Sequence, residues 1–378
     1  MKLTSAEQVA LEIFRAGLWG RTVNLPEGFN EWTDVMKFAK NQSIMVIIAK
    51  TIISDNECQT RVQKDFRLKL KSILVSNVMA FNAMTEVLKK VSTALKEAGI
   101  EHVLLKGHSL AKHYPYPETR QCGDIDLYVG IEKSLDTHRV LSTIAQEIDP
   151  ESDALWGKHY DAIVDDVHIE VHRHTNSYSL ARYAKAYNQI ADKGLTENLG
   201  QVTYDGVTIA EPSMDFYSYY IFDHIFEHFL TSGIGLRHLA DLMLFLHDNK
   251  DKINQTNLKK ILEDMDMMKP WQLFGCILVK HLGMPAEEFP FYAESDKADW
   301  AFGHVIAGGN FGKSTRYYTG RTGNYLSTKL NAIWCHITRG AQMMRVFPRQ
   351  EMRHFHHVLV KYLDHLRSDI KKKLNNGR

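Results

Sequence analysis

The spacing of apolar residues changes twice along the chain, and this change limits the fold more than any other feature. Up to residue 98 the apolar residues recur at intervals of three and four, which indicates helices. Residues 99–211 contain short apolar or alternating runs with helical stretches between them, which predicts strands and helices in one region. After Pro212 the helical spacing returns. The sequence therefore predicts an N-terminal helical lobe (1–98), an α/β or α+β core (99–211) and a C-terminal helical region (212–378).

Charge and cysteine content exclude several classes of protein. The 378 residues include 46 Lys and Arg and 45 Asp and Glu, so there is no global basic field that would attract nucleic acid or an anionic membrane. The four cysteines lie far apart, which argues against a disulfide scaffold and a thiolate zinc site. The N-terminal stretch MKLTSAEQVALEIFRAG predicts a capped amphipathic helix and no signal peptide, and no apolar run reaches about 18 residues. We expect a soluble, cytoplasmic protein without a membrane span.

Two aspartates interrupt a run that otherwise predicts a buried strand, residues 124–129 (DIDLYV). Alternate residues of a strand face the same way, so Ile125 and Leu127 point into a core while Asp124 and Asp126 share the other face. Two carboxylates a few ångströms apart repel each other unless a positive charge lies between them. A divalent cation satisfies this condition, and carboxylate oxygens suit Mg²⁺.

A third carboxylate occurs in the later run VHIEVHRH, residues 167–174. The same alternation buries Val167, Ile169 and Val171 and places Glu170 on the opposite face, between His168 and His172. Glu170 is therefore a candidate third metal ligand. The alternative is that both strands are only amphipathic, with polar faces in water.

A turn that suits an anion precedes the two aspartates. The run HVLLKG predicts a short strand that stops at Gly107, and HSLAKHY predicts a helix directly after it, with Ser109 near its start. Free main-chain N–H groups at such a junction attract phosphate, and glycine lets the backbone approach closely. Together with the paired carboxylates, this turn predicts a phosphate site beside a metal site.

These motifs resemble those of a known superfamily. A Gly-x-Ser turn, a strand with two alternating aspartates and a later strand with one carboxylate resemble the DNA polymerase β-like nucleotidyltransferases. More narrowly, LLKGHSLAKHYPYPETRQCGDIDLYV, HIEVHRH and DHIFEHFLTSGIGLRHLADLMLFLH resemble the uncharacterised nucleotidyltransferase branch, over roughly residues 75–310. The resemblance implies an α+β nucleotidyltransferase fold with a mixed β-sheet core. One departure is His108, which stands where many members carry a second small residue.

The resemblance also implies an activity. It is the transfer of a nucleoside monophosphate from an NTP to an acceptor hydroxyl, with release of pyrophosphate. Asp124 and Asp126 would bridge two Mg²⁺ ions, for which Mn²⁺ is an alternative, and Glu170 would bind the catalytic ion and help to remove the proton of the acceptor. The acceptor is left open between a small molecule, a protein and an RNA.

The same resemblance implies roles for the residues of the turn. Gly107 and Ser109 would hold the β- and γ-phosphates, and Lys106 is a candidate for neutralising their charge. Arg120 is a second candidate, although we interpret it as a solvated loop cation. His172 and His174 are candidates for supporting the metal ligands.

The segment HIFEH, His224 to His228, matches the H-x-x-E-H pattern of a zinc hydrolase. The surrounding helix is aromatic on nearly every side, so we interpret the two histidines as hydrogen-bonded groups of a core helix. The resembled branch carries a histidine-bearing helix here, which implies that His224 and His228 support the acceptor or nucleotide pocket. The zinc hydrolase remains an alternative function, as does a catalytically silent nucleotide-binding or adaptor protein of the same fold.

Two further stretches need an interpretation. AGGNFGKST, residues 307–315, is a near match to a phosphate-binding P-loop, but no strand is predicted before it, so we interpret it as a loop that could still contact phosphate or acceptor. The basic, aromatic stretch from Arg345 onwards could contact RNA or a membrane. We favour a terminal helix that packs its Phe, Val and Leu face on the protein and leaves its basic face in water.

Overall fold

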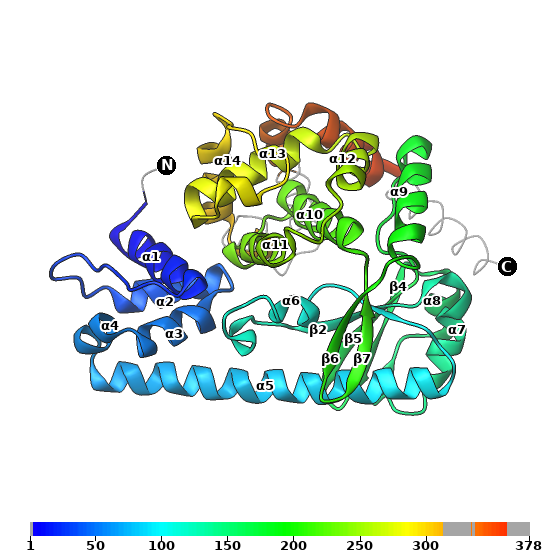
Figure 1. Ribbon diagram of the computed structural model, residues 1–378, viewed down its shortest axis with the longest axis horizontal. Helices are drawn as coiled ribbons and strands as arrows, with labels where there is room; N and C mark the ends of the chain where they lie inside the picture. The colour runs from blue at the N-terminus through cyan, green and yellow to red at the C-terminus, as the bar shows by residue number, and fades with distance from the viewer. Residues whose placement is uncertain (1–2, 313–333, 335–336, 361–378) are drawn as a thin grey trace, which may run out of the picture.

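The computed structural model describes residues 3–312, 334 and 337–360. Its first helix begins as predicted, with a capping box in which the Thr4 hydroxyl accepts from the Glu7 amide and the Glu7 carboxylate accepts from the Thr4 amide. The last N-terminal helix, α5, is 34 residues long and runs beneath both the other N-terminal helices and the sheet (Figure 1). The N-terminal helices are α1 (Ser5–Trp19), α2 (Trp32–Asn41), α3 (Met45–Ser54), α4 (Asn56–Arg61) and α5 (Lys64–Glu97).

The middle of the chain forms a mixed sheet of seven strands among the described residues, in the order β3-β4-β5-β2-β1-β7-β6. β2 is parallel to β5 and β1 is parallel to β7, whereas the other neighbouring strands are antiparallel. The predicted α+β class is confirmed. The strands are β1 (Val103–Leu104), β2 (Asp124–Tyr128), β3 (Glu147–Ile148), β4 (His159–Val164), β5 (Val167–His172), β6 (Gly200–Tyr204) and β7 (Val207–Glu211).

Local sequence signals located most of these strands. The pair Asp205-Gly206, a strong local signal for a hairpin, joins β6 to β7, and both turn residues have a positive φ, 44° and 87°. The short strand β3, Glu147–Ile148, was not predicted, because two residues are too few to show a recognisable alternation. The predicted helix after Gly107 is confirmed as α6 (His108–Ala111), although it is only four residues long.

One face of the sheet packs on α5, and the strand residues that the alternation predicted to be buried lie on this face. Ile125 and Leu127 of β2 and Ile169 and Val171 of β5 are fully buried in one hydrophobic cluster. The same cluster takes in the second half of α5, with Val87, Leu88, Val91 and Leu95. Along the chain, α7 (Gly130–Leu141) lies between β2 and β3, and α8 (Glu151–Trp156) lies between β3 and β4.

The C-terminal helices cover the other face of the sheet, where Figure 1 places α10 and α11 on the side opposite α5. They share a second hydrophobic cluster with the N-terminal helices α1 to α3, so the two helical regions pack on each other. The boundaries of the three predicted regions stay a prediction. The helices after α8 are α9 (Ala181–Gly194), α10 (Met214–Thr231), α11 (Leu236–Asn249), α12 (Gln255–Asp264), α13 (Met268–Ile277) and α14 (Ala298–Gly308).

The C-terminal helix, residues 348–360, packs differently from the expectation. Phe347 is buried against Phe226, with ring centroids 5.0 Å apart, but Phe355 is 64% exposed. The basic side is partly packed instead of solvated, because Arg353 lies over the ring of Tyr183 at 4.6 Å. Within the described part of the chain, no helix combines the length and apolar character that crossing a membrane requires.

Candidate functional site

The three predicted carboxylates lie together. Asp124 and Asp126 project from β2, and the parallel pairing of β2 with β5 sets Asp126 beside Glu170. Ligand oxygens of Asp124, Asp126 and Glu170 lie within 4.8 Å of one another. Because hard oxygen ligands at this spacing suit a divalent cation, the three side chains could hold one.

Asp126 is fully buried, so the alternative of a solvated polar face is wrong for this residue. Its Oδ1 accepts from the ammonium of Lys106 and from Nε2 of His172, the latter at 2.8 Å. Burial alone would raise the pKa of the Asp126 carboxyl, but Lys106 and His172 outweigh it and lower that pKa below its usual value. Asp126 is therefore ionised in the folded protein.

The other oxygen of the same carboxylate shows that the site fits a cation. Oδ2 of Asp126 is buried and has no hydrogen-bond partner among the described residues. Nearby, burial and the charge of Asp126 raise the pKa of Asp124, whose carboxylate pairs with no cation of the described chain. A buried, unbonded anionic oxygen is costly, and a bound divalent cation would satisfy both carboxylates at once.

His172 supports the carboxylates from β5. Its Nε2 lies 2.8 Å from Asp126 Oδ1 and 3.2 Å from Glu170 Oε2. Burial lowers the pKa of His172, yet these two hydrogen bonds raise it overall, and the same contact with His172 lowers the pKa of Glu170. His172 therefore contacts two of the three carboxylates, and its supporting role stays a prediction. The other candidate, His174, belongs to neither of the two groups of potential metal ligands found among residues 3–312, 334 and 337–360.

Gly107 provides the close backbone approach that the turn requires. Its φ of 75° and ψ of −115° are accessible mainly to glycine. A Cβ atom here would lie 3.3 Å from the main-chain oxygen of Asp124 and 3.6 Å from Oδ2 of Asp126. Glycine therefore keeps the main chain of the turn against the carboxylates.

Ser109 does not reach the cavity beside the carboxylates. Its hydroxyl donates to the main-chain oxygen of Leu105 at 2.6 Å and contacts the hydroxyl of Tyr217. Its helix, α6, begins at His108 and is four residues long, too short for the helix dipole to add much attraction for phosphate. Gly107 and Lys106 line the cavity instead, so direct phosphate contact is open to these two residues.

Replacing Gly107 by alanine tests this turn. Because alanine is strained at this φ and ψ, Gly107→Ala is expected to lower the free energy of unfolding by about 1–3 kcal/mol. Gly123→Ala is the matched control, since Gly123 lies in the same cavity wall and a Cβ there meets no atom within 4 Å. Urea unfolding measures both variants. Equal stability of the two variants would contradict the requirement for glycine at position 107.

His108, the departure from the superfamily pattern, points away from the cavity. Its ring stacks on Phe81 of α5 at 4.3 Å, and its Nε2 lies 2.9 Å from the hydroxyl of Thr85. Burial, followed by the charge of Arg120, lowers the pKa of His108 to about 4. A neutral histidine packed on α5 anchors the turn to the long helix and leaves the cavity free.

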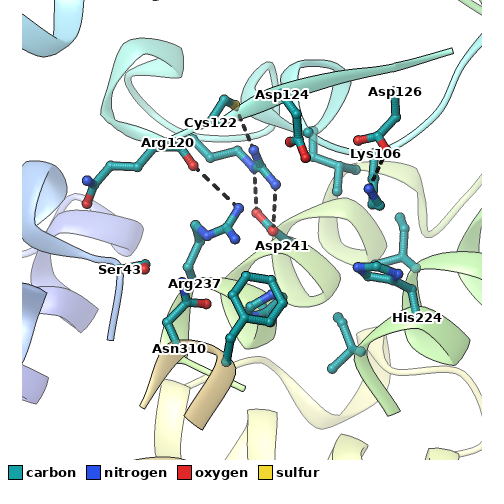
Figure 2. Close-up of a pocket in the computed structure, with 18 of the residues that line it drawn as sticks. Ser43, Lys106, Arg120, Cys122, Asp124, Asp126, His224, Arg237, Asp241 and Asn310 are labelled. Carbon is teal, nitrogen blue, oxygen red and sulfur yellow. Dashed lines mark hydrogen bonds and ion pairs between the residues drawn. The ribbon is translucent and has the colours of Figure 1, made fainter. Parts of the chain in front are cut away.

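A cavity of about 290 Å³ opens beside the carboxylates. Figure 2 shows the side chains that line it, which come from every region of the chain. Its walls are formed by β2, the residues 120–123 before it, α10, α11 and two distant loops. The lining residues include Ser43, Lys106, Gly107, Arg120, Gln121, Asp124, Asp126, Tyr220, His224, Arg237, His238, Asp241, Asn310 and Phe311.

Arg120 is not a solvated loop cation, so that interpretation is wrong. It is buried, and its Nε and Nη2 donate to the two oxygens of Asp241 at 2.7 and 2.8 Å. Burial lowers the pKa of the Arg120 guanidinium, but Asp241 raises it well above its usual value. Asp241 also accepts from the hydroxyl of Tyr114 at 2.8 Å. This bidentate ion pair joins the loop before β2 to α11 (Figure 2).

Sequence reasoning missed several residues of the cavity. Arg237 and Asp241 stand four apart in LRHLAD and therefore share a helix face, a signal that was available. Ser43 lies far from the motifs, and nothing local in the sequence links it to the carboxylates. Its place depends on how the loop after α2 packs on the start of α11, where the Gln42 side chain accepts from the Leu236 amide.

His224 and His228 do not form the zinc site that the alternative function, a zinc hydrolase, would require. Their rings meet edge to face, with centroids 4.6 Å apart, and burial lowers the pKa of both, to about 4 for His228. Neither group of potential metal ligands in the described residues contains them or Glu227. Their helix, α10, buries seven of its aromatic side chains, as expected of a core helix: Phe216, Tyr217, Tyr219, Tyr220, Phe222, Phe226 and Phe229. His224 nevertheless lines the cavity, as the resemblance implied.

The near match to a P-loop lacks the strand that a P-loop follows. Ala307 and Gly308 are the last residues of helix α14, and Asn310–Gly312 form a short 3-10 helix after it. A helix and not a strand precedes this segment, so the interpretation against a P-loop is confirmed up to Gly312. Lys313 to Thr315 lie outside the described residues. Asn310 and Phe311 line the cavity, which agrees with the expectation that residues 307–315 could contact phosphate or acceptor.

Comparison of the sequence with models of protein families gives the same assignment as the motifs. Among solved structures, an antigenic nucleotidyltransferase-like protein from Paracoccidioides brasiliensis is similar, with 12% identity and a TM-score of 0.33, over 54% of this chain and 93% of that chain. The comparison with curated proteins finds no match. The sequence model of the family described as uncharacterised nucleotidyltransferase matches residues 29–283, well over half of the chain. The protein therefore belongs to the uncharacterised nucleotidyltransferase family, as its motifs predicted.

Proposed function

We propose that the protein is an enzyme that moves a nucleoside monophosphate from an NTP to an acceptor hydroxyl and releases pyrophosphate. Membership of the family supports nucleotidyl transfer in general. The observation that supports the specific reaction is the cluster of Asp124, Asp126 and Glu170, whose ligand oxygens lie within 4.8 Å of one another and whose two aspartates line a cavity. A silent adaptor would have no need for three repelling carboxylates.

Asp124, Asp126 and Glu170 would hold Mg²⁺, with Mn²⁺ as the alternative and two ions expected. When bound, such ions neutralise charge on the transferred phosphoryl group and on the leaving pyrophosphate. The buried Oδ2 of Asp126 and the ionised state of its carboxyl fit this role. His172 keeps the carboxylates of Asp126 and Glu170 in place through its two hydrogen bonds.

The other residues of the site bind and orient the substrate. The main chain of Gly107 and the ammonium of Lys106 would contact the phosphates, while Ser109 acts on them only through the shape of the turn. The full burial of Asp126 and the partial burial of Lys106 limit how much water weakens these interactions. The acceptor is a small molecule, a protein or an RNA, and it would approach on the side of Glu170.

The test combines NTP binding with transfer of label. Thermal unfolding is recorded with ATP, GTP, CTP or UTP, each with Mg²⁺ or with EDTA, and α-labelled NTPs are incubated with the protein and cell extract. We expect at least one NTP to raise the melting temperature only with Mg²⁺, and label to appear on the acceptor. Asp124→Asn should lose both effects, because it removes a metal ligand.

The matched control is Asp161→Asn. Asp161 lies on β4 opposite Glu170 and is paired with His168 at 3.4 Å, outside the group of three carboxylates. This variant should keep NTP stabilisation and labelling. If no NTP stabilises the wild type with Mg²⁺, or if Asp124→Asn behaves as the wild type does, the proposed site is wrong.

A further inference from the structure

Among the residues that the structure describes, the charged groups of the cavity are paired except for two. Lys106 is paired with Asp126, and Arg120 is paired with Asp241, as the dashed lines in Figure 2 show. The remaining anion is Asp124 and the remaining cation is Arg237. Neither forms an ion pair with another residue of the described chain. A cavity in which one anion and one cation have no ion-pair partner in residues 3–312, 334 and 337–360 suits a ligand that carries both a cation and an anion.

The guanidinium of Arg237 is poorly satisfied by the protein. Its Nη1 donates to the main-chain oxygen of Gln121 at 3.4 Å, which is a long hydrogen bond. Its Nε is buried and has no hydrogen-bond partner among the described residues. An arginine carries five N–H donors in a planar fork that matches two phosphate oxygens. Most of these donors at Arg237 are available to a ligand in the cavity.

The backbone of Arg237 is fixed by the N-terminal helices. The side chain of Gln42 accepts from the amide of Leu236 at 3.0 Å and donates to the main-chain oxygen of Ile306 at 3.0 Å. Gln42 is fully buried, so it ties the start of α11 to α14 and to the loop after α2. The backbone at Arg237 is therefore held in place, and only the Arg237 side chain needs to adjust to a ligand.

We infer that Arg237 binds the β- and γ-phosphates of the NTP while Asp124 and Asp126 hold the accompanying metal ions. This inference rests on the proposed function and adds the residue that recognises the triphosphate. The free carboxylate and the free guanidinium lie on different elements, β2 and α11, and border the same cavity. A metal–triphosphate complex supplies a cation for the Asp124 carboxylate and an anion for the Arg237 guanidinium. Arg237 also explains how the site binds phosphate although Ser109 faces away.

The experiment uses calorimetry to measure the binding of inorganic tripolyphosphate in the presence of Mg²⁺. Arg237→Gln should lower the affinity for tripolyphosphate about ten- to a hundredfold, because it loses charge-assisted hydrogen bonds. The affinity for Mg²⁺ alone should not change. Arg237→Lys should recover part of the loss, because lysine keeps the charge without the fork. In the transfer assay, Arg237→Gln should raise KM for the NTP more than it lowers kcat.

The matched control is Arg353→Gln. Arg353 also donates to a main-chain oxygen, that of Met265 at 2.8 Å, but lies outside the cavity. This variant should bind Mg²⁺–tripolyphosphate as the wild type does. Unchanged binding by Arg237→Gln, or by a folded Arg237→Lys should the glutamine variant fail to fold, would overturn the inference. The inference also fails if Arg237→Gln transfers label with the same KM and kcat as the wild type. If Arg237→Gln loses tripolyphosphate but the wild type transfers no label, only the proposed function fails.

Discussion

Replacing Asp126 by asparagine is expected to lower the rate of nucleotidyl transfer by about a thousandfold. A metal clamp supplies several kcal/mol of charge stabilisation in the transition state, and ~4 kcal/mol corresponds to about that factor. Asp126 holds the central position, because its Oδ1 is engaged by Lys106 and His172 while Oδ2 is left for a cation. Asparagine has the same shape but no charge, and one of its two terminal atoms is a donor.

The effect must be separated from loss of the fold. In Asp126→Asn the amide oxygen of the new side chain can still accept from His172, so we expect a folded protein, which circular dichroism and urea unfolding check. Asp161→Asn is again the control, since its carboxylate lies on the neighbouring strand and outside the group of three. Transfer by a folded Asp126→Asn within tenfold of the wild type would contradict a central role for this carboxylate.

The sequence predicted the parts of the site that depend on local pattern. The alternation in DIDLYV and VHIEVHRH located Ile125 and Ile169 in the core and placed the three carboxylates on the other face. Strand alternation is a geometric property of the backbone, so it needs no knowledge of the partner strand. Glu170 can act as a third ligand only if its strand lies beside that of the aspartates, and the parallel pairing of β2 with β5 meets this condition.

The parts that depend on tertiary contacts were missed or misjudged. Arg120 was interpreted as solvated because its partner, Asp241, is 121 positions away. Ser109 was expected to contact phosphate because its hydroxyl follows Gly107, but Tyr217 and Leu105 occupy that hydroxyl. Which polar side chains face a cavity is decided by the elements that close it, and these elements come from distant parts of the sequence.

Replacing Arg120 by methionine is expected to lower the free energy of unfolding by about 3–5 kcal/mol, the usual cost of breaking a buried ion pair by removing one partner. The side chains of Arg120 and Asp241 are only 3% and 5% exposed. Without Arg120, the Asp241 carboxylate would remain in the cavity wall with the hydroxyl of Tyr114 as its hydrogen-bond donor. Urea unfolding at neutral pH measures the loss.

Two comparisons make this prediction specific. Arg139→Met removes an exposed ion pair to Asp136, with side chains 64% and 53% exposed, and should cost at most about 1 kcal/mol. The double variant Arg120→Met/Asp241→Leu should recover most of the loss, because replacing both partners by apolar groups leaves no buried charge. If Arg120→Met is no less stable than Arg139→Met, the ion pair does not hold the loop before β2 to α11. Recovery in the double variant would show that the cost comes from the uncompensated Asp241 carboxylate and not from lost packing.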